Sequence, residues 1–267
     1  MTTLEILTLA VVQGVAEFLP ISSSGHLVVV SALFHAGDAT AEAASADVNI
    51  VLHGGTLISI LAFYWRRIWR LIGADRRVIP LLIVGTIPAA VLGVIVKTQF
   101  ESLLESPLLA GCMLPVTGLM LLLISGREGG EDDYSKLSYK AVLVIGCFQA
   151  FALLPGISRS GSTIVAGLLV GLHRRAAATF SFLLAIPVIG GATVLELKDL
   201  VEAKSLDAPP SLLLAGAVVA FAVGLVSLAW LIRWIERGKL HYFAYWVIPL
   251  GLAIVVWQLM LLASGNG

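Results

Sequence analysis

Charged residues are scarce in this sequence, and their scarcity argues against an ordinary water-soluble protein. Of the 267 residues, 13% are charged and 58% are hydrophobic, whereas soluble domains carry about 25% charged residues. The 17 basic and 17 acidic residues cancel to a net charge of 0, so no overall positive field would attract nucleic acid. The composition predicts a protein whose surroundings are the lipid bilayer and which has no nucleic-acid partner.

Cysteine is rare in the sequence, and an N-terminal basic cluster is missing. Only Cys112 and Cys147 are present, both inside apolar runs, which argues against a disulfide scaffold. No Lys or Arg precedes the first apolar stretch, MTTLEILTLAVVQG, so we do not expect a cleaved signal peptide. The segment should stay in the mature protein.

Long apolar runs fill most of the chain. Two regions, 4–36 and 141–173, are interrupted by Pro, Gly and clustered hydroxyls, so that each half is too short to cross a bilayer. We expect each to be a re-entrant helix hairpin, because irregular backbone at membrane depth needs protein or a water-filled cavity around it. Full crossings of roughly 20 residues are predicted at 48–65, 79–96, 107–125, 178–197, 211–232 and 244–263.

The distribution of Lys and Arg supports the two hairpins independently. Thirteen of the 17 basic residues fall in alternate loops, namely 66–77, 126–140, 171–177 and 232–241. The positive-inside rule places these loops in the cytoplasm and both termini outside. This alternation holds only if both interrupted regions return to the side from which they enter.

A weak internal repeat relates the two halves. A shift of 136 residues superposes Gln13 on Gln149, Ile21-Ser22 on Ile157-Ser158 and Ser24-Gly25 on Ser160-Gly161. We therefore predict an all-α polytopic membrane protein with one membrane domain, 1–267. Its two repeats, about 4–125 and about 141–263, would each hold a hairpin and three crossings. An odd number of crossings makes the repeats inverted, which predicts a shared site near the midplane.

Ionisable residues inside the apolar regions are few, and Glu17 and Arg159 are the most telling. A charge at mid-depth costs roughly 2.5–3.5 kcal/mol on insertion scales, so such residues are expected to be functional and to find partners. Glu17 and Arg159 could be each other's partner. An ion pair that only joins the hairpins is the structural alternative.

Hydroxyls surround both charged residues. Arg159 lies in SRSGST, 158–163, just before an apolar helix, where a guanidinium and the free amides of a helix start can hold phosphate oxygens. SSSGH, 22–26, forms a similar helix start in the first hairpin. Serines at such positions are also common helix caps, but together with Glu17 and Arg159 they favour an anion site.

Three further features point to chemistry at this site. Gln13 and Glu17 are four residues apart and would share one helix face, where they could present an amide and a carboxylate to a divalent cation such as Mg²⁺ or Ca²⁺. His26 follows Ser23 by three residues, which brings an imidazole near a hydroxyl, although a buried structural histidine is the alternative. His53, beside Gly54 and Gly55, more simply indicates close helix packing.

Two motifs resemble those of the undecaprenyl-diphosphate phosphatase family, the membrane enzymes associated with bacitracin resistance. The segment QGVAEFLPISSSGH, 13–26, resembles the first family motif, and PGISRSGST, 155–163, resembles the second. The similar pattern of spans covers almost the whole chain. The sequence departs from the family pattern at two positions. Gln13 stands where many members have Glu, and Asn49 stands near the start of the next span, where an acidic residue is expected.

The resemblance implies removal of the terminal phosphate from undecaprenyl diphosphate, which recycles the carrier lipid for cell-wall synthesis. It further implies a location in the inner cell membrane, a site open to the outer, periplasmic side, and a polyprenyl diphosphate lipid as substrate. Glu17, Ser23, His26 and Arg159 would be catalytic. Ser22, Ser24, Ser158, Ser160 and Thr163 would bind phosphate, and Glu17 with Gln13 would hold a divalent cation.

Several alternatives stay open at the level of the sequence. The attacking group could be Ser23, His26 or a water molecule. Inverted repeats with broken helices also occur in secondary transporters, so a polyprenyl-phosphate flippase or another transporter with an anion site is the rival function. A homodimer is a further expectation.

Overall fold

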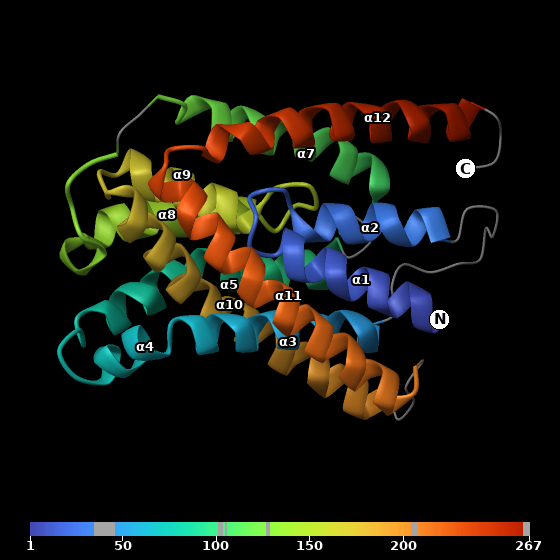
Figure 1. Ribbon diagram of the computed structural model, residues 1–267, viewed down its shortest axis with the longest axis horizontal. Helices are drawn as coiled ribbons and strands as arrows, with labels where there is room; N and C mark the ends of the chain where they lie inside the picture. Colours follow the sequence, from blue (N-terminus) through green and yellow to red (C-terminus); the bar gives the residue numbers. More distant parts are fainter. Residues whose placement is uncertain (35–45, 101–103, 105, 127–128, 204–207, 264–267) are drawn as a thin grey trace.

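The chain folds into a bundle of helices (Figure 1). The computed structural model describes residues 1–34, 46–100, 104, 106–126, 129–203 and 208–263. Within these ranges the only β-type pairing is one isolated bridge between Asp132 and Leu172. The predicted all-α class is confirmed.

The breaks within the two interrupted regions fall at the positions expected from their Pro, Gly and hydroxyl clusters. In chain order they are α1 (Thr3–Ala16), α2 (Ser23–Phe34), α3 (Ala46–Phe63), α4 (Trp65–Ile72), α5 (Val78–Gln99), α7 (Pro107–Leu123), η1 (Tyr134–Lys136), α8 (Tyr139–Phe151), α9 (Arg159–Leu169), α10 (Arg174–Ala203), α11 (Pro210–Glu236), η2 (Leu240–Phe243) and α12 (Ala244–Ala263).

Most of the predicted crossings have the length and composition of membrane spans. Over the described part of the chain, four helical stretches qualify: α5, the first part of α10, α11, and α12 together with η2. Helices α3 and α4 make a fifth if the pair, bent by 72°, is one span. Helix α7, the remaining predicted crossing, is a shorter apolar helix of 17 residues. The protein is a multi-pass membrane protein.

The outer surface of the bundle is apolar. Large side chains on several helices are widely exposed, for example Leu4 at 70%, Val226 at 70% and Val194 at 67%. In water such a surface would be an aggregation hazard. In a bilayer these side chains face lipid, while the helices satisfy their own backbone hydrogen bonds.

Both predicted hairpins are present, and their turns meet inside the bundle. In Figure 1, α1 and α2 reach the middle of the molecule from the end where α1 begins, and α8 and α9 reach it from the opposite end. The connections α7–α8 and α11–α12 lie at that opposite end, whereas α12 finishes at the end where α1 begins. The inverted-repeat relation between the halves stays a prediction.

Close helix contacts hold the turns in place. Gly55 on α3 lies so near α11 that a Cβ atom would come within 2.5 Å of the Ala217 carbonyl oxygen, as small residues allow in membrane proteins. Gly156, in the turn between α8 and α9, has φ of +92°, and a Cβ there would come within 2.3 Å of the Ala110 carbonyl oxygen on α7. Only glycine fits this turn.

Candidate anion site at the two hairpin turns

Glu17 is the centre of a hydrogen-bond cluster at the end of α1. Its side chain is 6% exposed, and its backbone N–H still donates to the Gln13 carbonyl oxygen at 2.9 Å. Oε2 accepts from Ser23 Oγ at 2.8 Å and from Gln13 Nε2 at 3.2 Å. Oε1 accepts from Arg159 Nη2 at 3.0 Å. The carboxylate therefore connects both helices of the first hairpin to the second hairpin.

Arg159 reaches the cluster from the first residue of α9. Besides its bond to Glu17, Nη1 donates to the Ser181 carbonyl oxygen on α10 at 3.5 Å. The side chain is 14% exposed, so it is mostly buried. The predicted pairing of Glu17 with Arg159 is thus present, and the pair fits both the ion-pair alternative and a phosphate clamp, since a guanidinium has five N–H donors.

Ser22 builds the turn of the first hairpin. Its φ of +71° is rare for a residue other than glycine. Ser22 Oγ accepts from Gly25 N at 3.3 Å within the first hairpin and from Gly156 N at 3.1 Å across the interface. Its carbonyl oxygen accepts from His26 N at 3.2 Å, so Ser22 caps α2. Ser24, which is exposed, lies beside it with the two hydroxyl oxygens 3.3 Å apart.

The hydroxyls of the second hairpin are buried and mostly engaged with protein groups. Ser158 Oγ accepts from Gly161 N at 3.1 Å and caps α9. Ser160 Oγ donates to the Leu19 carbonyl oxygen at 3.3 Å, across the interface between the hairpins. Thr163 Oγ1 donates to the Arg159 carbonyl oxygen at 2.8 Å. These bonds shape the wall of the site, and direct contact of the three hydroxyls with phosphate stays a prediction.

Two residues of this wall were missed by sequence reasoning. Thr117 on α7 donates through Oγ1 to the Gly156 carbonyl oxygen at 2.8 Å and accepts from Ser158 N at 3.0 Å. Ser181 on α10 lies with its Oγ 2.6 Å from Thr163 Oγ1. Both hydroxyls lie within largely apolar helices, a pattern that indicates a polar partner inside the bundle.

His26 is near the site but does not bond to Ser23, which corrects the pairing inferred from their spacing. Its Nδ1 is 2.8 Å from the Ser22 carbonyl oxygen, and Trp246 Nε1–H on α12 donates to its Nε2 at 3.0 Å. Ser23 donates instead to Glu17. The group placed to accept a proton from the hydroxyl is therefore the carboxylate, and a direct role of His26 remains a prediction.

His53 lies closer to the cluster than its glycine-rich surroundings indicated. Its Nε2 is 4.0 Å from Glu17 Oε2, and its Nδ1 is 2.9 Å from the Asn49 carbonyl oxygen. Gly55, two residues later, has the predicted packing role against α11. His53 thus places an imidazole beside the carboxylate.

The site offers few ligands for a metal ion. Among the residues with described placement, no three or more His, Cys, Asp or Glu side chains are grouped as a metal site. Gln13 is fully buried and its Oε1 has no hydrogen-bond partner. A carboxylate and one free amide oxygen fit a divalent cation that takes its other ligands from phosphate and water.

The fold and the site together define a class of protein. Its charged and hydroxyl-bearing groups lie between two helix turns inside a multi-pass bundle, which is typical of membrane proteins with a functional site inside the bilayer. The chain belongs to the family of the bacitracin resistance protein BacA, whose profile matches residues 6–253. The family predicted from the two motifs is confirmed.

Relatives in this family are similar over nearly their full length. An undecaprenyl-diphosphatase of Rhodopirellula baltica is 55% identical over 258 residues, which cover 96% of this chain and 98% of the relative. Proteins of the same name from Methanosphaera stadtmanae and Corynebacterium glutamicum are 37% and 38% identical, each covering 97% of this chain. The alignments cover 99% and 90% of those two relatives.

Proposed function

We propose that this protein hydrolyses a polyprenyl diphosphate, such as undecaprenyl diphosphate, to the lipid monophosphate and inorganic phosphate. The observation that carries the proposal is the convergence of Ser23, Glu17 and Arg159 from two separate hairpins, with contacts of 2.8 Å and 3.0 Å to the shared carboxylate. Hydroxyl, base and phosphate-binding cation are the groups that phosphoryl transfer requires. The full-length similarity to undecaprenyl-diphosphatases supports the same activity.

Arg159 binds the terminal phosphate in this proposal. Its guanidinium can hold two phosphate oxygens at once, and it stands at the start of α9, where the helix dipole favours an anion. The start of α2, capped by Ser22, faces the same turn of the second hairpin, since Ser22 Oγ accepts from Gly156 N. The two helix starts therefore stabilise the negative charge that spreads over the phosphoryl oxygens during transfer.

Ser23 is the attacking group that the geometry favours. Its hydroxyl already donates to Glu17 Oε2, so the carboxylate takes the proton as Oγ forms a bond to the terminal phosphorus. The bond from that phosphorus to the bridging oxygen breaks, and the lipid monophosphate leaves. The departing monophosphate takes up the proton that Glu17 had accepted. Water then attacks the phosphoserine while Glu17 accepts a proton from that water and returns it to the serine oxygen, so that the serine hydroxyl and inorganic phosphate are released.

A divalent cation, Mg²⁺ or Ca²⁺, is part of the proposal. Glu17 and the unpaired amide oxygen of Gln13 would hold it, and when bound it would neutralise charge on the diphosphate. The residues of the chain keep their own tasks. Glu17 accepts the proton, Arg159 orients the phosphate, and the surrounding buried hydroxyls keep both hairpin turns in register.

The location and assembly proposed for the protein follow from the charge distribution and the family. We place it in the inner cell membrane with the site open to the periplasmic side, because the basic loops lie at the end away from the start of α1. Recycling of the carrier lipid on that side supports cell-wall synthesis and bacitracin resistance. A homodimer is part of the same proposal and is tested by the mass of the protein in detergent.

The experiment that tests this function is phosphate release by the purified protein from a polyprenyl diphosphate in detergent. We expect turnover by the wild type, a loss of at least about 10³-fold with Ser23→Ala, and a phosphoserine at position 23 when the reaction is quenched. Ser125→Ala, an exposed serine after α7, is the matched control. Movement of lipid across vesicles without phosphate release would instead support the transporter.

A further inference from the structure

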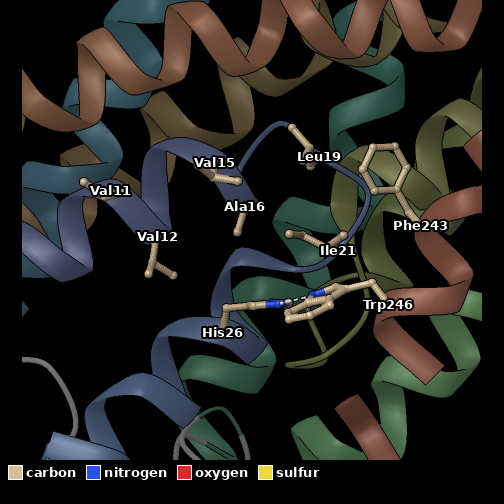
Figure 2. A pocket seen from close by; sticks show the side chains of 9 residues that line it. All are labelled: Val11, Val12, Val15, Ala16, Leu19, Ile21, His26, Phe243 and Trp246. Atoms are coloured by element: carbon tan, nitrogen blue, oxygen red, sulfur yellow. Dashed lines mark hydrogen bonds between the residues drawn. The ribbon is translucent and has the colours of Figure 1, made fainter. Parts of the chain in front are cut away.

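An apolar groove runs beside the first hairpin, outside the polar cluster (Figure 2). It has a volume of about 420 Å³. Val12 and Val15 on α1 form one side, and Ile21 in the turn and Trp246 on α12 lie across from them. Apart from His26 and the indole N–H, the lining side chains are hydrocarbon.

His26 and Trp246 together close one wall of this groove. The indole Nε1–H donates to His26 Nε2 at 3.0 Å, and the two rings lie 6.4 Å apart with planes 20° from parallel. Because the Ser22 carbonyl oxygen can only accept, His26 Nδ1 is the protonated nitrogen in the bond of 2.8 Å between them. A chain of bonds therefore runs from Trp246 through His26 to the turn that precedes Ser23.

The groove adjoins the turn of the first hairpin that carries Ser23. Ile21 and His26 line the groove and flank Ser22 and Ser23 in sequence. In a polyprenyl diphosphate the hydrocarbon chain starts directly at the inner phosphate, so its first carbons need an apolar surface next to the phosphate pocket. Trp246 is 55% exposed and Val11, another lining residue, is 44% exposed, so the groove also opens towards lipid.

We propose that this groove holds the first isoprene units of the polyprenyl chain and that Trp246 is a positioning residue which couples the chain to the reactive turn. The inference rests on the proposed function. A chain lying in the groove packs against the indole and keeps it on His26, which in turn braces the Ser22 carbonyl and the adjacent Ser23. A diphosphate without a chain leaves the exposed indole free to turn away.

Photochemical labelling tests the occupant of the groove directly. The probe is a farnesyl methylenediphosphonate, which resists hydrolysis, with a diazirine on the first isoprene unit. We expect label on α1 and α12 residues of the groove, prevented by excess undecaprenyl diphosphate. Label on other lipid-facing helices, or equal labelling of the groove by a photoreactive phospholipid that undecaprenyl diphosphate does not displace, would overturn the proposal.

Kinetics with three substrates test the coupling. Two variants are compared with farnesyl and undecaprenyl diphosphates. Val12→Trp fills the groove and should raise KM about tenfold. Trp246→Phe keeps an aromatic ring but loses the N–H donor, and it should lower kcat about tenfold with KM nearly unchanged. Both effects should be smaller by about fivefold or more with methyl diphosphate, which has no hydrocarbon chain to reach the groove. Leu4→Trp, exposed on the same helix but outside the groove, is the control.

The outcomes separate this inference from the function on which it rests. Equal effects of Val12→Trp and Leu4→Trp, or wild-type kinetics for Trp246→Phe, would refute the groove and the coupling while phosphate release still supports the function. Label confined to the groove without phosphate release from any of the three diphosphates would refute hydrolysis instead. Thermal unfolding of each variant in detergent checks that a loss is not caused by misfolding.

Discussion

The two hairpins share a backbone plan but carry different chemistry. In each, a serine cap accepts from the amide three residues later, Ser22 from Gly25 at 3.3 Å and Ser158 from Gly161 at 3.1 Å. A shift of 136 residues places Ser23 of the first hairpin on Arg159 of the second. The position that holds a hydroxyl in one hairpin therefore holds a guanidinium in the other.

The two hairpins also differ in their charged residues. The first hairpin contributes the carboxylate of Glu17, whereas the corresponding residue of the second, Leu153, is apolar. One carboxylate can be neutralised by one guanidinium at 3.0 Å, while a second buried acid would need a second partner. The caps make the shape common to both halves, and the charged residues give each half a separate task.

The largest expected effect comes from the carboxylate of the first hairpin. Glu17→Gln removes the proton acceptor of Ser23 and should lower kcat by about 10²–10⁴-fold. It also leaves Arg159 without its buried partner, which should lower the free energy of unfolding by about 3–5 kcal/mol. Phosphate release and thermal unfolding measure the two losses. Glu236→Gln, an exposed acid paired with Arg175 at 3.5 Å, should change neither substantially.

The second largest loss of activity is expected from a change of the guanidinium in the second hairpin. Arg159→Lys keeps the charge but loses the flat fork that binds two oxygens, so kcat/KM should fall by about 10²-fold. Arg70→Lys is the matched control, since Arg70 on α4 forms an ion pair with Asp75 at 3.1 Å. If Arg159→Lys retained full turnover, the ion pair would only join the hairpins, and the division of tasks between them would be wrong.

Removal of the two serine caps should reduce the stability of the protein by different amounts, because only Ser22 also joins the two hairpins. Ser158→Ala should cost about 1 kcal/mol in the free energy of unfolding, as a helix cap does. Ser22→Ala should cost about 2 kcal/mol, since Ser22 Oγ also accepts from Gly156 N. Chemical denaturation in detergent measures both, and equal losses would contradict the joining role. Ser22→Gly should recover part of the loss by relieving the φ of +71°.

The smallest effect is expected from the paired glutamines. Gln13→Glu places a second carboxylate beside Glu17 and should lower the Mg²⁺ or Ca²⁺ concentration for half-maximal activity several-fold. Gln149 on α8, its counterpart in the repeat, donates to the Gly85 carbonyl oxygen at 3.4 Å, so Gln149→Glu should reduce stability without changing the cation requirement. A cation titration of phosphate release distinguishes them. Identical titration curves for Gln13→Glu and the wild type would remove Gln13 from the cation site.

Much of the fold was predictable because apolar length and backbone breakers act locally. The interruption at Pro20 and at Pro155-Gly156 placed both hairpins within a few residues, and the two motifs identified the family. Contacts between distant spans were not predictable in this way. Thr117 and Trp246 occupy apolar stretches with no motif around them, and their partners Gly156 and His26 are far away in the sequence.

The membrane class, the two helix hairpins and the family could all be inferred from the sequence, because a bilayer selects for apolar length and penalises every isolated charge. The pairing of side chains from distant helices became visible in the folded structure alone. The fold brought Glu17 onto Ser23 and Arg159, and it turned His26 away from Ser23 towards Trp246. Those pairings depend on how α1, α9 and α12 pack, and packing is a property of surfaces that adjoin only after the chain has folded.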